Sequence, residues 1–101
     1  MYSNIIGRTV WDKCQNESIW RDDYDARIEV EDNSLFDRID IRYDSLLEPG
    51  EIKGVWIVRY VEVAGGLGED TTYLAGMPMD EQKKIFDIFE KEIEKRLGIK
   101  K

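Results

Sequence analysis

The run from Val55 to Val63 constrains the fold of this chain more than any other segment, because it is apolar or aromatic on both faces of an extended strand. Side chains alternate along a strand, so the valines and Ile57 at odd positions share one face, and Trp56, Val58 and Tyr60 share the other. Such two-faced strands are typical of the interior of a sheet. We expect the C-terminal segment to cover one face, and the N-terminal segment or another chain to cover the other.

Two alternating segments precede this run and predict a β-hairpin. Residues 24–31 and 35–43 each alternate apolar and charged side chains, and Asp, Asn and Ser separate them. One register brings opposite charges together, whereas a pairing shifted by two residues puts like charges face to face at a cost of roughly 0.2–1 kcal/mol per pair. The favoured register pairs Glu29 with Arg38, Arg27 with Asp40, Ile28 with Ile39, and Ala26 with Ile41.

The C-terminal segment 79–97 has the three- and four-residue apolar spacing of an amphipathic helix. Pro78 suits its first turn, and Gly98 is a natural stop. Its apolar stripe consists of Ile85, Ile88, Phe89, Ile93 and Leu97.

These elements predict one α+β domain over residues 1–101, a length close to the commonest domain size. An antiparallel sheet of about four strands, over residues 24–76, packs against the one C-terminal helix. The apolar residues within residues 1–23 follow no single helix or strand period. A short helix around residues 9–15 and an extra strand near residues 18–21 are alternative interpretations of that segment.

Composition narrows the classes of function. The formal net charge is −7, and such an acidic field repels phosphates, which argues against direct binding of nucleic acid. The single cysteine, Cys14, cannot form an intramolecular disulfide. The N-terminus lacks the pattern of a signal peptide, and Val55–Val58, the longest apolar run, is too short to cross a bilayer. We therefore expect a cytoplasmic protein without membrane attachment.

The residues that most often carry catalysis are missing. The chain has no histidine, which removes the commonest general base and, with only one cysteine, a structural zinc site within the chain. Gly65, Gly66 and Gly68 are followed by Glu69 and Asp70, whose charges would repel a phosphate, so these glycines predict a flexible hairpin loop. We predict no enzyme activity, no catalytic residue, no metal site and no cofactor.

The candidate binding residues are acidic and aromatic. The acidic residues are dense around the first hairpin and have alternative interpretations as solvated surface or as oxygen ligands of a metal ion. Trp56 and Tyr60 share one strand face, where they either form a second small core with Trp11 and Trp20 or remain exposed as interface anchors. The predicted partner-binding residues are Asp22, Asp23, Asp25, Asp40, Asp44, Trp56 and Tyr60.

We therefore predict a small acidic regulator or inhibitor that binds a basic protein partner and occludes its surface. In one version the carboxylates imitate nucleic-acid phosphates. Small phage-encoded inhibitors, including anti-CRISPR proteins, often have this character, which is an analogy of class. The first alternative is a self-associating structural subunit, for instance a homodimer, held by residues 55–63 or an uncovered sheet face. The second is a carboxylate-based protein that binds a small ligand or a metal ion.

Overall fold

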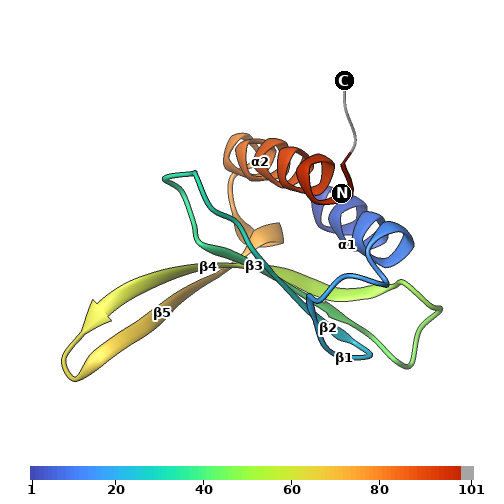
Figure 1. The fold of residues 1–101 in the computed structure, drawn as a ribbon, viewed down its shortest axis with the longest axis horizontal. Helices are drawn as coiled ribbons and strands as arrows, with labels where there is room; N and C mark the ends of the chain where they lie inside the picture. The colour runs from blue at the N-terminus through green and yellow to red at the C-terminus, as the bar shows by residue number, and fades with distance from the viewer. Residues whose placement is uncertain (99–101) are drawn as a thin grey trace.

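The computed structural model describes residues 1–98, so residues 99–101 of the predicted domain lie outside the described part. One antiparallel sheet carries both long helices on the same face (Figure 1). Its strands follow one another in space in chain order, from β1 at one edge to β5 at the other. The elements are α1 (Tyr2–Lys13), β1 (Trp20–Asp22), β2 (Asp25–Glu29), β3 (Arg38–Tyr43), β4 (Ile52–Val63), β5 (Gly66–Tyr73), the 3-10 helix η1 (Leu74–Gly76) and α2 (Met79–Leu97).

The α+β class, the antiparallel sheet and the C-terminal helix are confirmed, with five strands where the sequence predicted about four. The register of the β2–β3 hairpin is also as predicted. Glu29 pairs with Arg38 and Arg27 with Asp40, while the apolar partners Ile28 and Ile39 are fully buried on the opposite face. Charge pairing and burial thus favour the same register.

Helix α2 has the predicted bounds. Pro78 precedes it, and Gly98 ends it in the left-handed conformation at φ 71°, which glycine adopts without strain. Ile85, Phe89 and Ile93 are buried against the sheet side of the molecule. No helix in residues 1–98 is long and apolar enough to cross a membrane.

The N-terminal segment contains both elements that its pattern left as alternatives, a helix and a strand. Helix α1 begins at Tyr2, earlier than expected, and lies beside α2 on the same face of the sheet (Figure 1). It approaches β4 closely at Gly7, where an added Cβ would lie 2.2 Å from Cγ2 of Ile52. The N-terminal segment therefore shares the covered face with α2, and no helix of residues 1–98 lies over the other sheet face (Figure 1).

Strand β4 is interior only over its first half. β3 pairs with it from Ile52 to Val58, and beyond that point β4 pairs with β5 alone. The two strands continue as a projecting hairpin, which we call the hairpin arm and define as residues 59–70 (Figure 1). The predicted central strand is thus correct for Val55–Val58, while the residues after it form an arm whose glycine tip includes Gly65 and Gly66 at φ 93° and 141°.

Candidate functional site

The predicted binding residues occupy two separate places. Asp22, Asp23 and Asp25 lie in and beside the β1–β2 turn, and Asp44 opens the β3–β4 loop. Those two connections lie at the same end of the sheet, which we call the acidic end. The remaining candidates, Asp40, Trp56 and Tyr60, lie on the sheet face that carries no helix, which we call the open face.

The acidic end is held by backbone contacts between its two turns. The backbone N–H of Tyr43 donates to the carbonyl oxygen of Tyr24 at 2.8 Å and so joins the β1–β2 turn to the end of β3. Within each turn an aspartate accepts a backbone hydrogen bond: Oδ1 of Asp22 from the N–H of Tyr24 at 2.7 Å, and Oδ1 of Asp44 from that of Leu46 at 2.9 Å. These bonds fix the backbone and leave carboxylate oxygens facing solvent.

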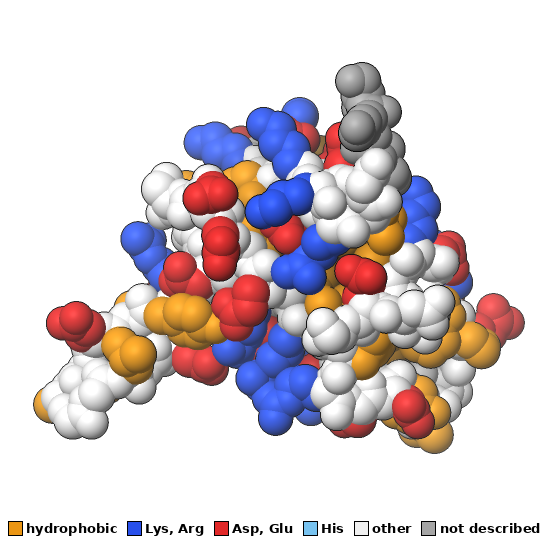
Figure 2. All heavy atoms as spheres, viewed as in Figure 1, with side chains coloured by type: hydrophobic (Ala, Val, Ile, Leu, Met, Phe, Trp, Pro, Cys, Tyr) orange, Lys and Arg blue, Asp and Glu red, His pale blue; other side chains and the backbone are white. Residues whose placement is uncertain are grey.

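Apolar side chains project from the acidic end beside the carboxylates. Leu46 is 90% exposed and Leu47 is 55% exposed in the β3–β4 loop, and Tyr24 is 46% exposed in the β1–β2 turn. Figure 2 shows acidic and apolar side chains together at the right of the view, over this end of the sheet, whereas basic side chains gather below its middle. The two leucines were not predicted as binding residues, although an apolar pair inside a turn, without a strand or helix period, is a signal that could have found them.

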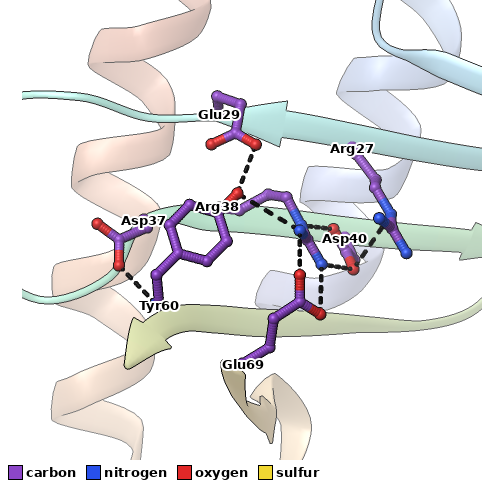
Figure 3. A network of polar contacts seen from close by, with 7 residues as sticks. All are labelled: Arg27, Glu29, Asp37, Arg38, Asp40, Tyr60 and Glu69. Atoms are coloured by element: carbon purple, nitrogen blue, oxygen red, sulfur yellow. Dashed lines mark hydrogen bonds and ion pairs between the residues drawn. The ribbon is translucent and has the colours of Figure 1, made fainter. Parts of the chain in front are cut away.

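The open face is organised by Arg38, whose side chain is only 5% exposed (Figure 3). Its guanidinium donates to both carboxylate oxygens of Asp40, at 2.7 and 3.0 Å, and to both of Glu69, at 2.7 and 3.3 Å. The hydrogen bonds to Asp40 are the chief reason why the pKa of Arg38 is raised. Asp40 also lies 3.6 Å from Nε of Arg27. Asp40 is thus neutralised inside the protein by two arginines.

Tyr60 belongs to the same network. Its hydroxyl donates to Oε1 of Glu29 at 2.6 Å and accepts a longer bond, 3.4 Å, from Nη1 of Arg38. Its backbone N–H donates to Oδ2 of Asp37 at 2.8 Å. The bond to Glu29 is the main cause of a raised pKa for the Tyr60 hydroxyl. Asp40 and Tyr60 therefore make structural contacts that join β2, β3 and β4, and Arg38 extends the network to Glu69 of β5.

The tryptophans lie on both sides of the sheet. Trp56 is half-buried on the open face, where its ring packs against Tyr73 at a centroid distance of 5.3 Å above Gly54. Trp11 and Trp20 instead pack against Tyr43 on the helix side, at 5.0 and 5.5 Å. The second small core of Trp11, Trp20, Trp56 and Tyr60 is therefore wrong, because the sheet separates the two pairs.

Metal binding was an alternative interpretation of the acidic residues. In residues 1–98 no three cysteine or carboxylate side chains are grouped so that they could hold a metal ion. The aspartates of the acidic end are distributed over the β1–β2 turn, the start of β2 and the β3–β4 loop. Asp22 and Asp23 are exposed and Asp25 and Asp44 are half-buried, an arrangement that suits contact with an extended surface.

The chain matches no protein-family model, no curated protein and no solved structure.

Proposed function

We propose that this protein is a binding regulator that occludes a basic surface of a partner protein with its acidic end. One observation carries the proposal: exposed Leu46, Leu47 and Tyr24 project from the same two turns that carry outward carboxylates. Protein interfaces combine apolar anchors with a polar rim. An apolar anchor surrounded by acids fits a pocket with lysines or arginines around it.

The distribution of charge supports the acidic end over the open face. On the open face, Asp40 has cationic partners in Arg38 and Arg27, and Glu69 has one in Arg38. In contrast, Asp23 and Asp25 form no ion pair within residues 1–98. Unpaired surface carboxylates steer a basic partner and speed association, and they do so less as salt rises.

The test compares how well four proteins, the wild type and three variants, capture the partner. In the first variant Asp22, Asp23, Asp25 and Asp44 become Asn, and in the second Leu46 and Leu47 become Ser. A control variant with the same change of charge carries Gln at Glu31, Glu62, Glu81 and Glu90, which are exposed elsewhere. We expect both acidic-end variants to lose the captured protein and the control to retain it. Equal capture by the Asn variant, or capture insensitive to salt, would overturn the proposal.

Mimicry of nucleic acid is the narrower version of this function. It requires that the partner's occluded surface is the one that binds phosphates. Duplex DNA added to the captured complex then competes with the protein and releases the partner in proportion to its concentration. A complex that duplex DNA does not dissociate at low salt would exclude mimicry and leave the basic-partner proposal in place.

Self-association is a second candidate function, favoured by the hairpin arm. Val63 is 53% exposed and Leu67 is 80% exposed on this projecting pair of strands, and β5 presents an outer edge. Exposed edge strands pair readily with other chains. Size-exclusion chromatography with light scattering distinguishes the two functions, because a monomer at high concentration contradicts obligate self-assembly.

A further inference from the structure

We propose that a hollow beside the acidic end binds the cationic side chain, arginine or lysine, of the partner protein. This inference rests on the proposed function and specifies where a side chain of the partner binds. The hollow has a volume of about 510 Å³ and lies between the C-terminal end of α1 and the β1–β2 turn. The residues that line it include three aromatic residues, Trp11, Trp20 and Tyr24, and three acidic residues, Glu17, Asp22 and Asp23.

The aromatic wall is held in place before any ligand arrives. Nε1 of Trp20 donates to the carbonyl oxygen of Cys14 at 2.8 Å, which fixes the indole against the end of α1. Trp11 and Trp20 meet edge to face, with centroids 6.0 Å apart and planes at 85°. Tyr43 packs behind both rings and is itself buried. Trp11 and Trp20 remain half-buried, so part of each ring is accessible from the hollow.

The carboxylates of the hollow can accept further hydrogen bonds. Oδ1 of Asp22 accepts the N–H of Tyr24, which leaves its second oxygen, and the carboxylates of Glu17 and Asp23 form no hydrogen bond or ion pair within residues 1–98. Lys13 and Arg21 belong to the neighbouring chain segments, but neither forms an ion pair with these carboxylates. Three carboxylate residues therefore border the aromatic residues, and no lysine or arginine of the described residues forms an ion pair with them.

This combination selects a cation over other ligands. The negative faces of indole and phenol rings attract ammonium and guanidinium groups. Carboxylates beside those rings add charge-assisted hydrogen bonds and repel any anion. A neutral apolar ligand would desolvate the carboxylates without compensation. Arginine and lysine satisfy both walls, because their methylene stems pack on the rings while the charged head reaches the carboxylates.

The experiment uses the three indole N–H signals of the full chain in proton–nitrogen NMR spectra. N-acetyl-arginine amide and N-acetyl-lysine amide are the probes, and N-acetyl-citrulline amide, which lacks the charge, is the matched neutral compound. We expect saturable shifts at Trp11 and Trp20 with either cation. Trp56 lies on the open face and serves as an internal control that does not shift.

Two double variants test whether the carboxylates of the hollow bind the cationic probe. Glu17→Gln with Asp23→Asn should weaken binding of N-acetyl-arginine amide at least fivefold, whereas Glu31→Gln with Glu62→Gln should change it less than twofold. Both pairs are on the surface and do not contribute to the core. Shifts that do not saturate, equal binding of citrulline, or equal losses in the two variants would each overturn the proposal.

Failure here and failure of the proposed function are distinguishable. If the acidic end captures its partner by the criteria above but the indole signals do not respond to either cation, the partner is anchored elsewhere, by Leu46 and Leu47. If the indole signals respond but capture survives loss of the acidic end, the hollow is a cation site and the regulator proposal is wrong.

Discussion

The hydroxyl of Tyr43 in β3 donates a 2.6 Å hydrogen bond to the backbone carbonyl of Gly7 in α1, and both partners are buried. The contact fixes α1 on the sheet at Gly7, where the helix lies close to Ile52 of β4. The same tyrosine ring supports Trp11 and Trp20. One side chain therefore connects the docking of the first helix to the aromatic wall of the hollow.

Tyr43→Phe removes this hydrogen bond and keeps the ring. We expect the free energy of unfolding to fall by about 1 kcal/mol, which is typical of the loss of one buried hydrogen bond. Urea unfolding followed by circular dichroism measures the change. Tyr24→Phe, at an exposed ring, is the control and should be neutral within about 0.5 kcal/mol.

The burial of Tyr43 also leads us to predict how the free energy of unfolding changes at high pH. An unperturbed tyrosine titrates near pH 10, and burial raises the pKa of Tyr43 above that value in the folded protein. The unfolded chain therefore binds fewer protons above about pH 10, so the stabilisation is complete below that pH and is lost as the pH rises towards the folded pKa. The wild type should lose stability more steeply than Tyr43→Phe between about pH 10 and 11. Parallel curves would contradict a buried neutral tyrosine.

Gly7→Ala tests how closely α1 approaches the sheet. In an isolated helix this change is favourable by about 1 kcal/mol. Here the new Cβ would lie 2.2 Å from Cγ2 of Ile52, so we expect destabilisation of about 1–3 kcal/mol, as in an overpacked core. The double variant with Ile52→Ala should recover part of this loss, measured as a coupling energy in a double-mutant cycle. Stabilisation by Gly7→Ala alone would show that the helix does not pack this closely.

Arg38→Met tests the network of the open face. It leaves the carboxylates of Asp40 and Glu69 without their main cation, and we expect a loss of about 2 kcal/mol. This is less than for a fully buried pair, because Glu69 is half-exposed. Arg59→Met, on the exposed part of β4, is the control and should change stability by less than about 0.5 kcal/mol.

The Arg38→Met variant should also change the titration of Glu69, which NMR can measure. The hydrogen bond from Arg38 lowers the pKa of Glu69 below its usual value, so the pair's contribution is present above about pH 4.3 and is lost as the pH falls through the folded pKa. Carbon NMR of the Glu69 carboxyl should show its pKa rising towards the usual value in Arg38→Met. An unchanged titration would mean that the two side chains do not pair in solution.

The sequence was most informative where local pattern and charge agree. The α2 stripe follows the helical period, and in the β2–β3 hairpin Arg27 and Glu29 have only one register that satisfies both charge and burial. The N-terminal segment was ambiguous because Trp11, Cys14 and Trp20 face the core from a helix, a turn and a short strand, and no single period describes three backbone geometries.

The candidate site was only partly predictable. Asp22, Asp23 and Asp25 are close in the sequence, and Asp44 joins them because alternate connections of an antiparallel sheet lie at the same end. The sequence could not show that Tyr60 is occupied, because its partners Arg38 and Glu29 lie 22 and 31 residues away in the chain. Alternation placed Trp56 and Tyr60 on one face, but only the sheet shows that Trp11 and Trp20 lie on the other.

The order of the strands has a consequence for the kinetics of folding. Each strand pairs with the next one along the chain, so the sheet can grow by successive hairpins that close short loops, the kind of local topology that folds quickly. The bond between Tyr43 and Gly7 spans 36 residues and closes a much longer loop. Docking of α1 should therefore follow the hairpins, and substitutions at Gly7 should accelerate unfolding while leaving the folding rate nearly unchanged.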